Sequence, residues 1–156
     1  MNRLDTYRYF LKDDIRKKID FRTTDQRRGV PAPPFQKPAD PSAERFDLSA
    51  VDDWRSRIGT VDLVEAIDRR KSRRRFTGAS LSLEELSFLL WATQKVKEVH
   101  PGSATLRTVP SAGARHALET YLAVFRVDNL EPGIYRYLPL DNQLVVGSHP
   151  PELREE

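Results

Sequence analysis

The first part of the chain joins a short amphipathic pattern to a proline-rich tract. Apolar residues recur every four positions among charged ones, at Tyr7, Leu11, Ile15 and Ile19. This spacing predicts a short helix. The tract from Arg22 to Phe46 lacks periodic apolar positions and contains five prolines, which interrupt helices and sheet ladders. We expect an extended arm there. Because ordering a chain costs about 1 to 2 kcal/mol per residue, the arm needs a surface outside its own chain to become ordered.

Two helices are predicted in the middle of the chain. Thr60 is a suitable N-cap for the first, and Asp62 follows near the positive end of the helix dipole. The apolar side of this helix is Val61, Leu63, Val64 and Ile67. For the second helix, Ser82 and Glu85 have the spacing of a capping box. Leu81 and Leu86 occupy the hydrophobic-staple positions, and the apolar face is Leu83, Leu86, Leu89 and Leu90.

Strand patterns follow after a loop that contains Pro101 and Gly102. The segment from Tyr121 to Val127 is rich in β-branched and aromatic residues, which predicts a mostly buried strand. Two further strands, Ile134 to Leu138 and Leu144 to Val146, are separated by turn residues. Helices that precede a small, mainly antiparallel sheet define an α+β fold.

The last residues predict the start of another helix, because Ser148, Pro150, Pro151 and Glu152 suit a cap and a first turn. A helix that stops at Glu156 would be too short for independent stability. We therefore expect the α+β domain to be incomplete in this chain.

Length and composition narrow the possible classes of protein. The 156 residues, 38% of them hydrophobic, suffice for one domain with appendages. There is no cysteine, which excludes disulfides, thiolate metal sites and cysteine nucleophiles. Since no apolar run has membrane-spanning length and the first ten residues lack a signal-peptide core, we expect a cytoplasmic protein without membrane contact.

Other candidate side chains point to packing rather than chemistry. His100, His116 and His149 are far apart in sequence and have no carboxylates at ligand spacing, so no metal site is expected. Trp54 and Trp91 are interpreted as core or packing residues rather than platforms for ring stacking. No serine lies in a nucleophile-elbow motif, so the sequence contains no motif that indicates a hydrolase.

The densest chemical pattern is the cationic segment Arg69–Arg75, which also contains Ser72 and is followed by Phe76. Guanidinium groups and a hydroxyl are the donors that a phosphate dianion requires. The same cations at a helix C-terminus also complement the helix dipole when simply solvated. Binding of RNA or DNA is a third interpretation, although the net charge of only +3 gives it little support.

A second pattern runs from Arg107 to His116, where small residues follow Pro110. Small residues let a flat ring or a phosphate approach the backbone closely, and amides at a following helix start can donate to it. A plain transition from loop to helix explains the same residues when this segment is considered alone.

Together, in this order and separation, the two segments resemble the nitroreductase superfamily of flavin enzymes, in particular its SagB-type branch, which oxidises azoline rings in peptide natural products. The resemblance extends from about Val61 to Val146 and includes the helical stretch Leu83 to Gln94. It implies a nitroreductase-like fold, of which this chain looks like the N-terminal half. The implied organisation is an N-terminal helix in residues 1–21, a proline-rich arm in 22–59, and part of an FMN-binding domain in 60–156.

The resemblance also implies roles for particular residues. Arg70, Ser72 and Arg74 would hold the phosphate and ribityl end of FMN, with Lys71 beside them. Pro110, Ser111, Ala112, Gly113 and Ala114 would line the isoalloxazine ring from the other subunit of a homodimer. Hydride would pass between flavin N5 and a nicotinamide or a small-molecule or peptide-derived substrate. No dinucleotide fingerprint follows a predicted strand, so NAD(P)H would bind only transiently, and no catalytic residue is assigned.

Two alternatives remain. The chain could be a truncated family member that keeps the fold without catalysis, or a small basic module that binds polyanions or nucleic acid through Arg69–Arg75. Uptake of FMN separates the flavoprotein from both.

Overall fold

The computed structural model describes residues 3–102 and 104–151 and divides the chain into two units, which meet between Pro33 and Pro34. The first unit consists of helix α1 (Arg3–Phe10) and the 3₁₀ helices η1 (Asp13–Lys18) and η2 (Phe21–Thr23). The predicted single helix across Tyr7 to Ile19 is therefore wrong. Ion pairs three residues apart, Asp13 with Arg16 at 2.9 Å and Asp14 with Lys17 at 2.7 Å, suit the tighter 3₁₀ turn.

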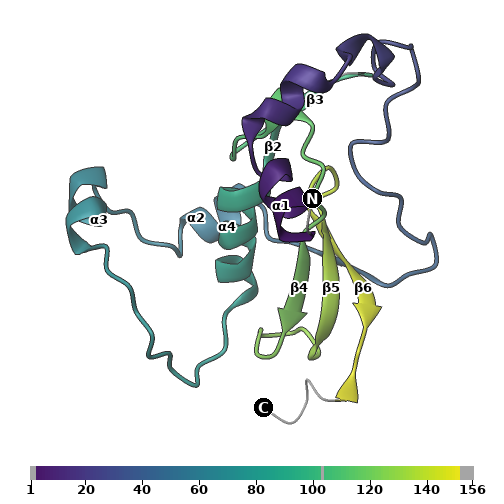
Figure 1. The fold of residues 1–156 in the computed structure, drawn as a ribbon. Coiled ribbons are helices and arrows are strands. Elements are labelled where there is room, and N and C mark those ends of the chain that lie inside the picture. The colour runs from purple at the N-terminus through teal and green to yellow at the C-terminus, as the bar shows by residue number, and fades with distance from the viewer. Residues whose placement is uncertain (1–2, 103, 152–156) are drawn as a thin grey trace. The chain divides into compact units, whose positions relative to one another are not determined.

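The second unit is built on a four-stranded antiparallel sheet (Figure 1) in the order β1-β6-β5-β4. Its strands are β1 (Arg45–Asp47), β4 (Tyr121–Val124), β5 (Gly133–Leu138) and β6 (Gln143–Ser148). The predicted strand at 121–127 is shorter and more exposed than expected because β4 lies at the sheet edge and pairs only with β5. The predicted α+β class is confirmed.

Helix α4 (Leu83–Gln94) covers this sheet, and its capping box is formed as predicted. Ser82 Oγ accepts from the Glu85 amide at 3.2 Å, and the Glu85 carboxylate accepts from the Ser82 amide at 2.8 Å. Leu86 and Leu90 are buried in the core, which also contains Leu48, Val124, Leu130, Tyr135, Tyr137 and Leu144. Leu89, expected on the same face, is 48% exposed.

One α-helix and three strands of the second unit were not expected from the sequence. Two of them, β1 and α2, lie in residues 22–59, which were predicted to be an extended arm, and β1 pairs with β6. Helix α2 (Val51–Arg55) places Trp54 against α4, and strands β2 (Val96–His100) and β3 (Ala104–Arg107) form a separate antiparallel hairpin. The hairpin includes the stretch taken for a loop at Pro101 and Gly102. Its strands show no clean alternation of apolar and polar residues, and a bulge interrupts their register between Val96 and Glu98.

Helix α3 (Leu63–Arg69) begins two residues later than predicted, because its N-cap is Asp62 rather than Thr60. The Asp62 carboxylate accepts from the amides of Val64 and Glu65 at 2.8 and 3.4 Å. None of its residues is buried, and the apolar side chains expected to face a core are exposed, Ile67 at 67% and Val64 at 74%. Figure 1 shows α3 standing apart from the sheet and from α4.

The end of the proline-rich arm is held by its own chain, contrary to the expectation that ordering requires an outside surface. Arg107 donates to the Phe35 carbonyl and Arg136 to the Pro38 carbonyl, each at 3.1 Å. Gln36 bonds the Leu140 amide and the Asp141 carboxylate at 2.9 and 2.7 Å. Polar bonds to main-chain carbonyls thus replace the apolar burial that this segment lacks.

The helix start predicted at Ser148 lies only partly within the described residues. Ser148 ends β6 rather than capping a helix, and residues 149 and 150 are not helical. Glu152 and the residues after it lie outside the described residues. Across the described ranges, no helix has both the length and the apolar character needed to cross a membrane.

Candidate functional site

The cationic segment leaves the end of α3 as exposed, extended chain. Arg69, the last helical residue, forms an ion pair with Glu65 at 2.7 Å. At Arg70 the backbone turns to φ −63° and ψ 121°, which ends the helix. Residues 70–80 are all exposed and contain no helix. The four residues assigned to the phosphate, Arg70, Lys71, Ser72 and Arg74, therefore present their side chains to solvent along one stretch of chain.

These side chains have no polar partner in the part of the chain that the structure describes. Apart from Arg69 with Glu65, no ion pair or side-chain hydrogen bond involves the cationic segment there. Clustered cations without acids raise the local positive potential and attract anions. A phosphate dianion that bound here would meet donors not already committed to other groups. The donor set thus fits the phosphate end of FMN.

The second segment, Pro110–Ala114, forms a tight turn after β3. Ser111 O accepts from the Ala114 amide at 3.0 Å, and Ser111 Oγ accepts from the His116 amide at 2.9 Å. Gly113 and Ala114 have φ values of 64° and 53° in the left-handed region, which is strained for alanine. The expected transition to a helix is wrong, because only the 3₁₀ turn η3 (Ala112–Ala114) forms and residues 115–120 are not helical.

A buried arginine supports this turn from β3. Arg107 is 8% exposed, and its burial lowers its pKa. Burial, and then the charge of Arg107, lower the pKa of His116, so this imidazole is neutral at physiological pH. The turn therefore has a neutral imidazole beside its small residues, of which Ala112 and Gly113 are exposed. A Cβ built at Gly113 would meet no atom closer than 3.8 Å. The space beside Gly113 is therefore open to a flat ligand.

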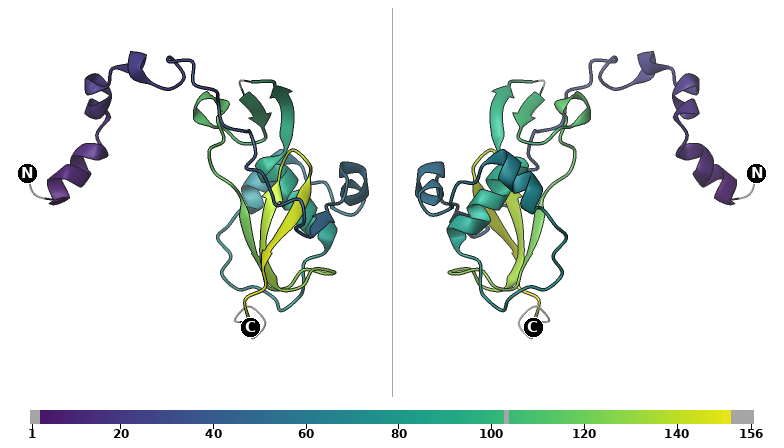
Figure 2. Two further views of the ribbon diagram at one scale, coloured as in Figure 1. Left: turned by 90° about the vertical axis from the view of Figure 1, so that its right-hand side faces the viewer. Right: turned by 90° about the vertical axis from the view of Figure 1, so that its left-hand side faces the viewer.

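The two segments are not brought together within one chain. Figures 1 and 2 show the segment after α3 and the turn after β3 at opposite ends of the second unit. A single chain therefore offers the two predicted halves of the flavin site separately.

An apolar groove lies beside the cationic segment. It has a volume of about 600 Å³ and is lined by the chain after Arg75, by α4 and by the edge strand β4. Phe76 is 87% exposed at its rim, and Leu81, Leu89 and Phe125 are also exposed. The cations are thus continuous with apolar surface, a combination that suits an amphipathic ligand or a second protein surface.

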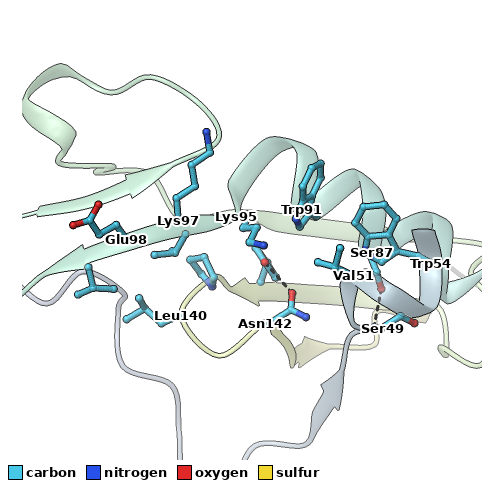
Figure 3. Close-up of a pocket in the computed structure, with 14 residues that line it drawn as sticks. Ser49, Val51, Trp54, Ser87, Trp91, Lys95, Lys97, Glu98, Leu140 and Asn142 are labelled. Atoms are coloured by element: carbon cyan, nitrogen blue, oxygen red, sulfur yellow. Dashed lines mark hydrogen bonds between the residues drawn. The ribbon is translucent and has the colours of Figure 1, made fainter. Parts of the chain in front are cut away.

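Sequence reasoning missed a cavity of about 410 Å³ between α2, α4, β2 and the turn from β5 to β6 (Figure 3). Trp54 and Trp91 pack edge to face at 5.1 Å, as their interpretation as packing residues requires, but they also line this cavity. No local motif could have revealed it, since its walls come from three segments that are distant in sequence, residues 49–54, 87–99 and 137–142. Among the described residues no group of His, Asp and Glu has the arrangement of a metal site.

Comparison with known proteins supports the resemblance to nitroreductases. The chain is 35% identical over 88 residues to "Putative nitroreductase MJ1384" of Methanocaldococcus jannaschii. The aligned part is 56% of this chain and 42% of that protein, so the chain spans about two fifths of the relative's length. No family model matches the chain.

Proposed function

We propose that this chain is the flavin-binding part of an FMN-dependent oxidoreductase of the nitroreductase type. The observation that carries the proposal is the run of exposed cations at 70–75, none with a partner in the described chain, together with the similarity to a protein named as a nitroreductase. When bound, FMN supplies reversible transfer of hydride between a donor or substrate and its N5 atom. The protein supplies the binding groups and their orientation.

The chain's own residues divide this work. Arg70, Ser72 and Arg74 donate to the phosphate and the ribityl end, and Lys71 adds charge beside them. The turn from Pro110 to Ala114 lies against the ring, where the small side chains and Gly113 permit close approach. The neutral His116 next to this turn adds no charge of its own near the ring.

The proposed active form is a homodimer. The two segments lie at opposite ends of the second unit, so each site takes the cations of one subunit and the turn of its partner. Exposed apolar residues on α3 and along the groove beside β4 provide surface for that contact. NAD(P)H is the proposed transient electron donor. A small-molecule or peptide-derived substrate, as in the SagB-type branch, is the proposed acceptor or donor of the hydride.

Titration with FMN tests the phosphate assignment. Removal of one charged or hydroxyl donor in Arg70→Ala, Ser72→Ala or Arg74→Ala should cost about 1.5 to 3 kcal/mol, or about ten- to a hundredfold in affinity. Quenching of flavin fluorescence measures this. Arg55→Ala, which removes an exposed arginine at the end of α2, is the matched control and should bind normally. Unchanged affinity in all three variants would refute the assignment.

The same exposed cations favour one second function, the binding of a polyanion without chemistry. Binding to nucleic acid should weaken steeply with salt, because each neutralised phosphate releases counterions. A chain that takes up no FMN but binds an oligonucleotide with this salt dependence would support the basic module instead.

A further inference from the structure

The segment that carries the Pro110–Ala114 turn has little regular structure of its own. It runs from the end of β3 at Arg107 to the start of β4 at Tyr121, and its one helical element is the 3₁₀ turn η3. A single 3₁₀ turn has poor hydrogen-bond geometry and contributes little stability. Other parts of the fold must therefore fix the position of the turn.

The turn is also held in a conformation that its residues do not favour. Ala114 and His116 have φ values of 53° and 44°, in the left-handed region that residues with a side chain rarely adopt. Such a conformation persists only where the surroundings impose it. The turn should therefore relax when the contacts that hold its segment are removed.

The proline-rich arm contacts both ends of this segment. At the first end, the Arg107 guanidinium donates to the Phe35 carbonyl at 3.1 Å. At the second end, the Lys37 amide donates to the Glu119 carboxylate at 3.0 Å. The left view of Figure 2 shows the arm beside the segment between β3 and β4. Two arm residues, only two positions apart, thus bridge both ends of the segment.

The two ends also interact electrostatically. Arg107 is buried, whereas the side chain of Glu119 lies in a half-buried residue next to β4. Burial lowers the pKa of Arg107, and the negative charge of Glu119 opposes that shift. The charge of Glu119 therefore stabilises the buried guanidinium as well as the bond to the arm.

The arm is in turn anchored to the sheet. Arg136, buried on β5, donates to the Pro38 carbonyl at 3.1 Å. Gln36 forms two hydrogen bonds to the turn from β5 to β6, at 2.9 and 2.7 Å. The arm thus connects the sheet with both ends of the segment that carries the turn.

We propose that residues 35–38 of the arm are a clamp that positions the Pro110–Ala114 turn for the flavin ring, with Arg107 and Glu119 as positioning residues. This inference rests on the proposed function, in which the turn lies against the ring. When the clamp is broken, the turn leaves the conformation that fits the ring. The ring end of the flavin then loses affinity, whereas the phosphate end, bound by the cationic segment, keeps it.

Substitutions on both sides of one hydrogen bond test the clamp in the whole chain. Glu119→Ala removes the acceptor, and Lys37→Pro removes the amide donor. Lys37→Ala keeps the amide and loses only an exposed side chain, so it is the matched control. Glu119→Gln keeps an oxygen acceptor and tests for rescue. Nitrogen–proton spectra without FMN follow hydrogen exchange of the Ala114 and His116 amides, which are bonded within the turn.

Exchange of these two amides should be about tenfold faster in Glu119→Ala and in Lys37→Pro. It should be no faster in the double variant, because both substitutions remove the same bond. Lys37→Ala should exchange like the unchanged chain, and Glu119→Gln should restore most of the slow exchange. The amides of β5 should keep their protection in all variants, which separates local opening from global unfolding.

Three probes then separate the ring from the phosphate. FMN and riboflavin, which has the ring but no phosphate, should each bind about tenfold more weakly to Glu119→Ala. The affinity for inorganic phosphate, measured by calorimetry, should not change. A merely structural role of Glu119 would weaken the binding of all three probes alike.

Unchanged exchange in Glu119→Ala would overturn the clamp, and this variant decides alone if Lys37→Pro does not fold. Faster exchange with unchanged flavin affinity would show that the arm does not serve the ring. Equal loss of phosphate and flavin affinity would assign the effect to the fold as a whole. A chain that binds neither flavin would refute the proposed function instead, and the exchange rates would still decide whether the arm holds the turn.

Discussion

Tyr137 shows how one side chain can set the response of the fold to pH. It is 2% exposed, and burial raises its pKa from the ordinary 10.0 to about 12. The unfolded chain loses this proton first, so the folded state becomes less stable as pH rises from 10 to 12. The loss amounts to about 2 to 3 kcal/mol.

Tyr137→Phe should therefore reduce the alkaline loss of stability, leaving the smaller part due to Tyr135, whose pKa burial also raises. Urea unfolding at a series of pH values measures the slope. An equally steep decline in the variant would show that Tyr137 does not stay protonated in the fold.

Gly133 begins β5 at a point where there is no room for a side chain. A Cβ there would lie 2.6 Å from His149 Nδ1 and 2.8 Å from the Ser148 carbonyl oxygen. Ser148 belongs to the neighbouring strand β6, so the backbone must move. Gly133→Ala should lower the free energy of unfolding by about 1 to 3 kcal/mol.

Gly78 provides the matched control, because a Cβ at this position meets nothing within 4 Å. Gly78→Ala should change the free energy of unfolding by less than about 0.5 kcal/mol. Equal effects of the two substitutions in thermal or urea unfolding would contradict the close approach of β5 and β6.

At the scale of elements, two helices with similar caps differ in what they pack against. Ser82 caps α4, whose Leu86 and Leu90 are in the core, whereas Asp62 caps α3, which has no buried residue. Ser82→Ala should lower the free energy of unfolding by about 1 kcal/mol. Asp62→Ala should unwind α3 locally and leave the global transition of the monomer unchanged. A similar loss in both variants, measured on a sample that sedimentation shows to be monomeric, would mean that α3 packs on the fold.

The elements also differ in how far the sequence could predict them. Helix α4 was predictable because its capping box and apolar spacing are local, and β5 and β6 because turn residues separate two apolar runs. The β2–β3 hairpin was not, since its bulge and polar strands hide the alternation. For the site, the sequence indicated the cationic segment. It could not indicate the Trp91 cavity, which depends on tertiary packing of distant segments.

For the whole molecule, the exposed apolar side of α3 is a candidate surface for the proposed dimer contact. Ile67 is 67% exposed on the helix that leads into the cationic segment. If the partner covers this side, Ile67→Asp should shift the chain toward the monomer and weaken FMN binding at least tenfold, without loss of fold stability in the monomer. Leu11→Asp, at an even more exposed position in the first unit, should do neither. Sedimentation and FMN titration measure both effects, and an Ile67→Asp dimer with normal affinity would exclude α3 from the contact.

The central claim is that each flavin is held by the cations of one subunit and the turn of its partner. It is tested by mixing two defective chains, one with Arg70→Ala and Arg74→Ala, the other with Gly113→Val. Each alone should bind FMN weakly. In a mixed dimer one site combines both defects and the other has none. Random exchange of subunits makes about half of the dimers mixed, and each of these has one intact site of two. Mixing should therefore restore about one quarter of the normal FMN-binding capacity. A mixture that binds no more FMN than the separate variants would contradict the shared site.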